Sequence, residues 1–183
     1  MLLYLMRHGI AQDRYDPDAP SDPERPLTAR GIERTESAVA GLLALDVEPD
    51  VVLTSPYVRA RETAEIAARV LRCDRASIIE TEALLPICDP SRLFLDLRRI
   101  DPSQALCVGH APSIDELCAF ALGGGTAPLT ELKKAGVAAI QIDAPAPAPA
   151  GRLLWLLEPG MLRELGRVAQ DKRPRRRKRG KRP

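Results

Sequence analysis

The chain contains only two histidines, and each directly follows a short apolar run that is typical of a β-strand. His8 comes just after residues 2–6, and His110 comes just after residues 105–108. In an open α/β sheet, ligands bind at the carboxyl ends of the parallel strands. Both imidazoles are therefore expected at the same edge of one sheet.

Two arginines accompany these histidines. Arg7 precedes His8, and a third strand-like run, 51–54, leads into a helix whose first turn is expected to carry Arg59. Guanidinium groups present paired donors that match phosphate oxygens. Nearby positive charge lowers the pKa of an imidazole, and a neutral histidine nitrogen is a nucleophile at physiological pH. This combination favours phosphoryl transfer through a phosphohistidine.

Three segments with this chemistry also carry a resemblance to a known family. They read Leu-Met-Arg-His-Gly at 5–9, Ser-Pro-Tyr-Val-Arg-Ala-Arg-Glu-Thr at 55–63 and Val-Gly-His at 108–110. In order and spacing they resemble the histidine phosphatase superfamily, so the resemblance covers the chain from residue 1 to at least residue 110.

Further segments resemble one branch of that superfamily, the SixA-type phosphohistidine phosphatases. They are Arg-Pro-Leu-Thr at 25–28, Leu-Pro at 85–86 and Trp-Leu-Leu-Glu-Pro at 155–159. The resemblance implies a three-layer α/β/α sandwich of the phosphoglycerate mutase-like type. It also implies a phosphohistidine-containing protein, such as a phosphotransfer domain, as substrate and partner, and it requires no cofactor and no metal.

The resemblance assigns roles to the residues that match its motifs. His8 would be the nucleophile that is transiently phosphorylated. Arg7 and Arg59 would hold the phosphoryl oxygens, while His110 would donate a hydrogen bond to the same group and stabilise the transition state.

Two further residues are candidate substrate-binding groups. Gly9 follows the nucleophile directly, and Arg25 precedes the first predicted helix, from where it could reach the phosphate or its carrier. The alternative for Arg25 is an ordinary surface or loop-bridging arginine.

The wider superfamily often uses an acidic residue after the third strand as proton donor, and here only Glu82 is a candidate. An alkoxide is a poor leaving group, whereas an imidazole with a conjugate-acid pKa of about 6.5 leaves phosphorus easily. The absence of the usual motif around Glu82 favours P–N over P–O substrates. We therefore predict a metal-independent phosphatase for protein phosphohistidine.

Two alternatives remain open at this point. One is a phosphomonoesterase that acts on a small phosphorylated metabolite with Glu82 as acid. The other, from a different class, is a phosphate-recognising binding module whose basic tail binds a polyanion.

The elements that must position these residues follow an alternating α/β pattern. The sheet is expected to be mostly parallel with an antiparallel edge strand, because a short Ala-Pro alternation at 144–151 joins the last two strands. The predicted strands are 2–6, 51–54, 77–80, 105–108, 137–142 and 153–157. Helices are predicted over 91–99, 112–122 and 161–168, and further helices begin near Thr28 and at Ser55.

The first of these helices is expected to have Thr28 as its N-cap, and the second to have Ser55 as its N-cap with Pro56 at its first position. Apolar spacing predicts that the first helix buries one face, formed by Ile32, Val39, Leu42 and Leu43.

Composition and charge set the wider limits. The chain has 183 residues, 45% hydrophobic and only 3% aromatic, which fits one globular domain with few residues for stacking on bases. Residues 1–171 carry 18 basic and 25 acidic side chains, while 172–183 carry nine basic and no acidic ones. We predict one domain over 1–171 and a basic tail over 172–183 that is disordered.

The tail could bind a polyanion, remain solvated without a dedicated partner, or fold back on the acidic body. The segment 9–24, rich in aspartate, is expected to form the variable rim that selects a protein partner. The four cysteines lack metal-type spacing and are expected to be reduced, with Cys107 a core residue rather than a nucleophile. With no signal peptide or membrane segment in evidence, a cytoplasmic location without membrane contact is expected.

Overall fold

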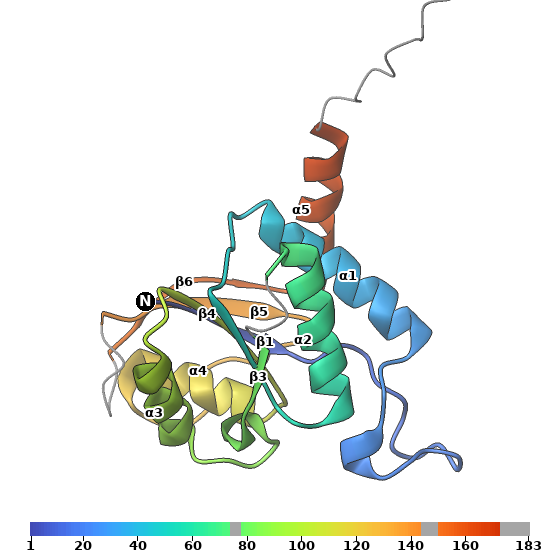
Figure 1. Cartoon of the computed structure of the whole chain (residues 1–183), viewed down its shortest axis with the longest axis horizontal. Helices are drawn as coiled ribbons and strands as arrows, with labels where there is room; N and C mark the ends of the chain where they lie inside the picture. The colour runs from blue at the N-terminus through green and yellow to red at the C-terminus, as the bar shows by residue number, and fades with distance from the viewer. Residues whose placement is uncertain (74–77, 144–149, 173–183) are drawn as a thin grey trace, which may run out of the picture.

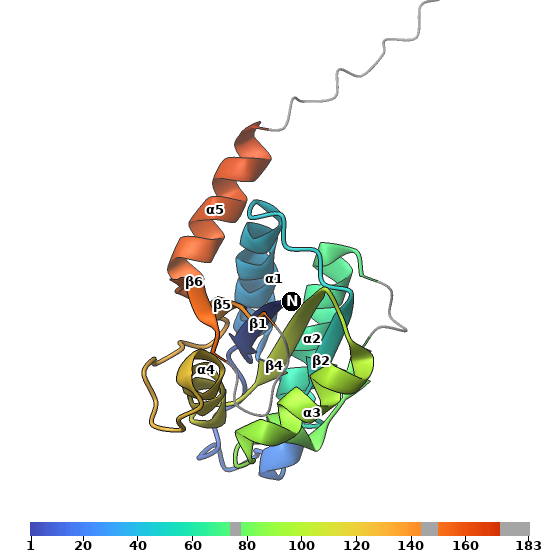
Figure 2. The ribbon, with the colours of Figure 1, turned by 90° about the vertical axis from the view of Figure 1, so that its left-hand side faces the viewer.

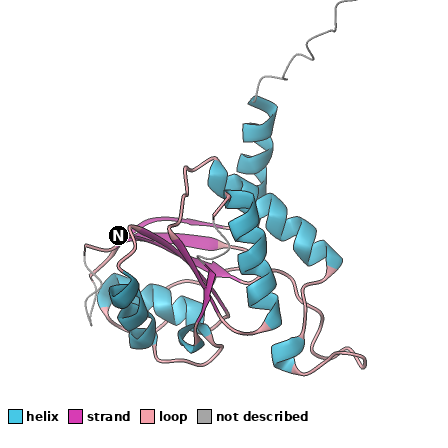
Figure 3. Ribbon diagram, in the orientation of Figure 1, coloured by secondary structure: helices cyan, strands magenta, loops and turns pink. Residues whose placement is uncertain are grey.

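A six-stranded sheet with the order β3-β2-β4-β1-β5-β6 forms the centre of the computed structural model, which describes residues 1–73, 78–143 and 150–172. Strands β1 to β4 pair in parallel, and β5 is reversed, because it pairs antiparallel with both β1 and β6 (Figure 3). The strands are β1 (Leu2–Arg7), β2 (Val51–Thr54), β3 (Ile78–Glu80), β4 (Gln104–Gly109), β5 (Val137–Gln141) and β6 (Arg152–Leu157). The expected mostly parallel sheet with antiparallel pairing at one edge is confirmed.

Helices cover both faces of the sheet (Figures 1 and 2). Successive residues of a strand point to opposite faces, so the central strands contribute to two separate cores. Leu5 and Cys107 pack beneath α3 and α4, whereas Met6 and Val108 pack beneath α1, α2 and α5. The helices are α1 (Ala29–Leu43), α2 (Val58–Leu71), α3 (Pro90–Ile100), α4 (Ser113–Gly123) and α5 (Pro159–Lys172). This is the predicted three-layer α/β/α sandwich.

Thr28 is the N-cap of α1, as predicted, and its Oγ1 accepts a hydrogen bond of 2.9 Å from the backbone N–H of Gly31. The prediction for Ile32 is wrong, because its side chain is 40% exposed, and Leu43 is only partly buried. Gly31 faces inward instead, where a Cβ would lie 2.0 Å from the carbonyl oxygen of Ile10. The loop after β1 therefore approaches the start of α1 too closely for a branched side chain. The buried face of α1 comprises Gly31, Thr35, Ala38, Val39, Gly41 and Leu42.

The start of α2 also differs from the prediction. The helix begins at Val58 with Tyr57 as N-cap, so Ser55 does not cap it and Pro56 precedes it. The Ser55 hydroxyl instead lies 2.8 Å from Nε2 of His110 and accepts a hydrogen bond of 3.3 Å from the Tyr57 N–H. The residues that looked like a helix start thus form the turn that leads from β2 into the site.

Helix α5 crosses α1 at a close backbone approach (Figure 1). A Cβ on Gly41 would lie 2.0 Å from the carbonyl oxygen of Leu162, and one on Gly166 would lie 3.0 Å from the Gly41 nitrogen. Glycine at these two positions lets the helices touch, which fixes the start of α5 beside α1.

Two predicted features fall on residues outside the described ranges. Most of the Ala-Pro connection between β5 and β6 lies at 144–149, and the basic segment lies at 173–183, while Lys172 itself ends α5. Residue 77, the predicted start of the third strand, is also outside them. Among the described helices, none is both long and apolar enough to cross a membrane.

Candidate active site

The strand register brings the two histidines together. Arg7 of β1 pairs with Gly109 of β4, so the residues that follow, His8 and His110, leave the sheet side by side. Their ring centroids are 5.0 Å apart, and the N–H of His8 donates a hydrogen bond of 3.0 Å to the Gly109 carbonyl. As predicted, both imidazoles lie at the carboxyl edge of the parallel strands.

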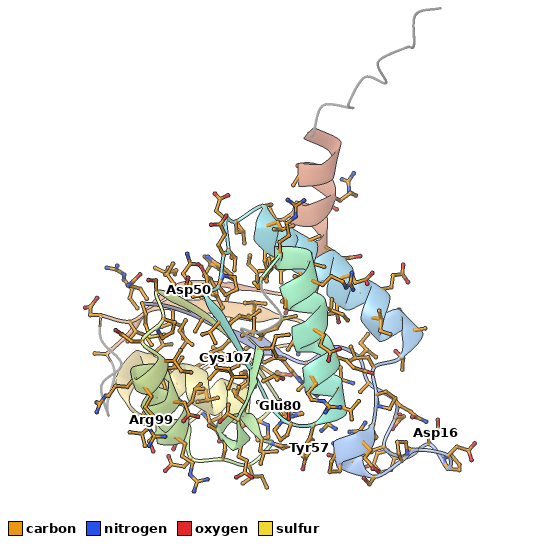
Figure 4. The ribbon with its side chains drawn as sticks, viewed as in Figure 1. Asp16, Asp50, Tyr57, Glu80, Arg99 and Cys107 are labelled. Carbon is orange, nitrogen blue, oxygen red and sulfur yellow. The ribbon has the colours of Figure 1, made fainter. Side chains whose placement is uncertain are left out.

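Strand β2 contributes the third part of this edge. Its last residue, Thr54, pairs with Val108, so the turn at Ser55 and the start of α2 adjoin the histidines. In Figure 4, Asp50 before β2 and Tyr57 after it mark the two ends of this strand. The Tyr57 ring packs edge-on against His110, with their centroids 5.1 Å apart.

The hydrogen bonds of His8 define its tautomer. Its Nε2 lies 3.3 Å from Nε of Arg59, and its Nδ1 lies 2.7 Å from the carbonyl oxygen of Gly9. A guanidinium can only donate, so Nε2 must accept, and the proton resides on Nδ1, which donates to Gly9. The Nε2 lone pair is thus held on the side of the ring that faces Arg59.

Both imidazoles are neutral at physiological pH. Burial lowers the pKa of His8 well below its ordinary value of 6.5, and the charges of Arg59 and Arg7 and the repulsion between the two histidines lower it further. Burial, followed by the positive charge of Arg59, lowers the pKa of His110 to about 3. The Arg7 charge acts in the same direction on both rings, which places this arginine in the same electrostatic site.

A carboxylate lies over the buried arginines of the site. Asp22 begins the short helix η1 (Asp22–Glu24), and its Oδ2 accepts a hydrogen bond of 3.1 Å from Nη2 of Arg59. Its Oδ1 accepts bonds of 3.0 and 2.6 Å from Nε and Nη2 of Arg25. Burial alone would raise the pKa of Asp22, but the hydrogen bonds from Arg25 and Arg59 lower it overall. The carboxylate is therefore ionised and bridges the two guanidiniums.

Arg25 is thus brought to the site, because it shares this carboxylate with Arg59, while its predicted contact with the phosphate or its carrier remains a prediction. Both arginines are buried, and Arg25 also donates to the carbonyl of Gln12. Arg7 donates a hydrogen bond of 2.8 Å from Nη1 to the Leu132 carbonyl, whereas its buried Nε has no partner among the described residues.

Comparison with known proteins identifies this arrangement. The family model of the histidine phosphatase superfamily, branch 1, matches residues 3–85. An uncharacterized protein of Picosynechococcus sp. is 34% identical over 145 residues, which cover 79% of this chain and 87% of that protein. The chain belongs to the histidine phosphatase superfamily.

The SixA type within this superfamily is also supported. Phosphohistidine phosphatase SixA of Escherichia coli K12 is 28% identical over 162 residues, covering 87% of this chain and 94% of SixA. A solved structure of the protein histidine phosphatase SixA with tungstate has a TM-score of 0.72 and 28% identity, and the match covers 88% and 99% of the two chains. This histidine phosphatase is therefore of the SixA type, with the phosphoglycerate mutase-like fold.

The segment 55–63 of this histidine phosphatase positions the nucleophile as well as supplying Arg59. The Thr63 hydroxyl accepts a hydrogen bond of 3.0 Å from the Gly9 N–H and donates one of 2.7 Å to the Arg59 carbonyl. Glu62 accepts a bond of 2.6 Å from the Leu27 N–H, which ties the loop before α1 to α2. The start of α2 thus orients the nucleophile segment as well as the arginine.

Gly9 contributes to the site through its backbone. Its carbonyl accepts the Nδ1 proton of His8, and its N–H is already bonded to Thr63. A Cβ at this position would lie 2.3 Å from Oγ1 of Thr35, so only glycine fits without displacing α1. Its predicted contact with substrate remains a prediction.

Glu82 is not among the residues that contact the two histidines. It begins the short helix η3 (Glu82–Leu84), is exposed, and lines a surface depression together with Thr81, Asp96 and Arg99. Across the described residues, it has no hydrogen bond or ion pair with either histidine or with Arg59. Its role as an acid remains untested.

Sequence reasoning missed three residues of this site. Asp22 was seen only as one of several acidic residues of a loop, although its spacing of three residues before Arg25 was available as a signal. Tyr57 and Thr63 lie inside the second motif, but only the fold reveals that they contact His110 and Gly9.

The cysteines take no part in the site. All four are free, and Cys107 and Cys118 are buried. Burial raises the pKa of Cys118 to about 12 and that of Cys107 even further, so both remain protonated thiols. The assignment of Cys107 to the core is confirmed. Within the described ranges, no group of three or more His, Cys, Asp or Glu side chains is arranged to hold a metal.

Proposed function

We propose that this histidine phosphatase is a metal-independent enzyme that hydrolyses protein phosphohistidine through a covalent intermediate on His8. The observation that carries the proposal is the pair of hydrogen bonds on His8, from Nδ1 to the Gly9 carbonyl and from Arg59 to Nε2. Together they support a neutral imidazole whose unprotonated Nε2 faces the cation that would hold the phosphoryl group.

In the first step, Nε2 of His8 attacks phosphorus, and a new P–N bond forms as the P–N bond to the substrate histidine breaks. Arg59 and Arg7 would neutralise the phosphoryl oxygens, and His110 would donate a hydrogen bond to the same group. The substrate imidazole departs with the electron pair of the broken bond and takes up a proton from water.

In the second step, a water molecule attacks the phosphoryl group on His8. A P–O bond forms, the P–N bond to His8 breaks, and the water proton leaves with solvent, so that orthophosphate and neutral His8 are regenerated. The same arginines would stabilise the charge in both steps, because the same phosphoryl oxygens carry the negative charge in each transition state.

A P–N substrate suits the acid-base groups around the site. Imidazole leaves without strong acid assistance, whereas an alcohol requires a proton donor. Asp22 is ionised by its bonds to two arginines, and Glu82 lies on a separate surface depression. Neither group is therefore ready to protonate an alkoxide, which disfavours the small-metabolite phosphomonoesterase.

A protein partner would approach the rim formed by residues 9–24. This segment projects from the body, as the position of Asp16 in Figure 4 shows, and the Tyr15 side chain in it is 86% exposed. Exposed aromatic and acidic side chains suit contact with a folded partner, such as a phosphotransfer domain, better than enclosure of a metabolite.

The deciding experiment compares two substrates without added metal, a phosphohistidine-bearing phosphotransfer protein and p-nitrophenyl phosphate. The expected result is rapid loss of phosphohistidine, slow ester hydrolysis, and neither reaction in His8→Ala. Glu82→Gln serves as the control and should leave phosphohistidine hydrolysis unchanged. Fast ester hydrolysis that Glu82→Gln abolishes would instead establish the phosphomonoesterase. Binding of phosphate analogues without any turnover would establish the binding module.

A further inference from the structure

A second cationic cavity lies next to the active site and shares Arg7 with it. Its volume is about 340 Å³. It is formed where α1, the segment before β5 and the start of α5 meet, and the glycine-mediated crossing of α1 and α5 fixes the position of one wall. The positively charged residues that line it are Arg7, Arg34, Lys133, Lys134 and Arg163.

Most of this positive charge is uncompensated. In the part of the chain that the structure describes, Arg34, Lys134 and Arg163 form no ion pair, whereas Lys133 pairs with the exposed Glu131 at 2.7 Å. The other acidic neighbours are Glu158, which acts on Lys133, and Asp13, which acts on Lys134.

These cations also repel one another. Burial, followed by the charges of Arg7 and Arg25, lowers the pKa of Lys134. Mutual repulsion within such a cluster is relieved when an anion binds to it.

Two buried polar atoms at the cavity lack partners, and they form an independent observation. Thr35 lines the cavity and is fully buried, yet its Oγ1 has no hydrogen bond, and the Nε of Arg7 is likewise unpartnered. Buried hydrogen-bonding groups are rarely left unsatisfied in native proteins. Both atoms are fully covered by neighbouring groups, so each can donate to an oxyanion only after its side chain turns toward the cavity, whereas the cationic side chains that line the cavity can contact the anion directly.

We propose that this cavity is a second anion site, which binds a carboxylate or phosphate group of the same molecule whose phosphoryl group reaches His8. Arg7 belongs to both sites, so the two anions would bind on either side of one guanidinium. The substrate part of this inference rests on the proposed function, whereas binding of an anion in the cavity does not. The consequence is selectivity for a phosphohistidine that has an acidic group nearby.

The kinetic test uses three phosphohistidine peptides of equal length, with glutamate, glutamine or phosphoserine beside the phosphohistidine, together with the N-acetyl amide of phosphohistidine, which carries no carboxylate. In the double variant Arg34→Gln/Arg163→Gln, kcat/KM for the preferred acidic peptide should fall about tenfold, the size expected when two ion pairs are lost. Values of kcat/KM for the glutamine peptide and for the N-acetyl amide of phosphohistidine should stay unchanged. Loss confined to the glutamate or to the phosphoserine peptide identifies the group as carboxylate or phosphate. Equal loss for all four substrates, or no loss, overturns the proposal.

The matched control is Arg152→Gln. This exposed arginine begins β6 and pairs with Gln141, which puts it at the opposite end of the sheet from Arg7. It removes charge without touching the cavity and should leave kcat/KM for all four substrates unchanged. A circular-dichroism melting curve of each variant checks that the fold is retained.

A binding test separates this proposal from the proposed function, because it needs no turnover. Inorganic phosphate is titrated into the His8→Ala protein while amide signals are followed by NMR. The signals of Thr35 and Gly160 report on the cavity, and those of Ser55 and Gly109 report on the catalytic pocket. In the His8→Ala protein, both pairs of signals should shift. When Arg34→Gln and Arg163→Gln are combined with His8→Ala in one protein, only the Ser55 and Gly109 signals should shift. A cavity pair that never shifts overturns the anion site even if phosphohistidine is hydrolysed.

Discussion

The carboxylate of Asp22 lies between the guanidiniums of Arg59 and Arg25, 3.1 Å from Nη2 of the first and 2.6 Å from Nη2 of the second. These guanidiniums are the groups expected to hold phosphoryl oxygens, so the carboxylate satisfies donors that an oxyanion would otherwise use. Asp22 is itself largely exposed, whereas both arginines are buried. An anion that reaches the two guanidiniums would therefore compete with this carboxylate for the same donors.

Asp22→Ala should strengthen the binding of phosphate analogues. Removal of the competing carboxylate, which pairs with both Arg25 and Arg59, is expected to lower the inhibition constant of tungstate about fivefold, or about 1 kcal/mol, which is within the range of exposed ion pairs. Inhibition of phosphohistidine hydrolysis by tungstate gives this constant directly. Asp18→Ala, a change in the same loop, controls for net charge. Weaker tungstate inhibition in Asp22→Ala would mean that the carboxylate positions the arginines rather than competing with the substrate.

The phosphoryl transfer step should remain fast at mildly acidic pH. His8 must be neutral to attack, and its pKa in the folded protein lies well below 6.5, so protonation disables it only below that lowered pKa. Single-turnover rates at about pH 5.5 are expected to lie within about twofold of those at about pH 7.5, after subtraction of spontaneous hydrolysis. A half-maximal rate near pH 6.5 would show that burial and the arginines do not act on His8 as described.

Unfolding should become easier as the pH falls below 6.5, in part because of His110. Its pKa is about 3 in the folded protein, so between about pH 3 and pH 6.5 the unfolded chain takes up a proton that the folded chain does not. The free energy of unfolding should therefore rise with pH across this window, and His110 should contribute about 1 kcal/mol per pH unit to the slope. Urea unfolding at several pH values measures the slope, which should be smaller by that amount in His110→Gln. An identical slope in the variant would contradict the burial of a neutral imidazole.

Thr63 should act as a positioning residue for the nucleophile. Thr63→Val leaves the Gly9 N–H without its acceptor, which should destabilise the fold by about 1–3 kcal/mol. Because the Gly9 carbonyl holds the Nδ1 proton of His8, kcat should fall about tenfold with little change in KM. Thr63→Ser keeps the hydroxyl and should restore kcat. Failure of this rescue would show that Thr63 acts through packing and not through its hydroxyl.

The sequence predicts the sheet, and it predicts that His8, His110 and Arg59 lie close together, for a physical reason. Parallel strands end at one edge, so a functional residue placed just after each strand is brought into the site whatever the loop details, as seen for His8 and His110. The alternating α/β pattern and the Thr28 cap are also local signals, and both are confirmed.

Features that depend on long-range contacts could not be predicted in this way. Ile32 has the spacing of a core residue. The buried position at the start of α1 is instead Gly31, which the Ile10 carbonyl approaches closely. Ser55 has the sequence context of an N-cap, but its hydroxyl forms a hydrogen bond with His110, which lies 55 residues away in the sequence. Asp22 meets Arg59 across 37 residues of sequence, which no local pattern encodes.

The single reversed strand has a consequence for how this protein can diversify. Since β5 runs against its neighbours, the segment that enters it, with Lys133 and Lys134, borders the catalytic edge, while β6 exits there toward Arg163. The nucleophile motifs sit instead on the exits of β1, β2 and β4. In the proposed scheme the two sites share Arg7, but Lys133, Lys134 and Arg163 lie outside the nucleophile motifs, so mutation of these residues can change substrate preference while the phosphoryl chemistry stays intact.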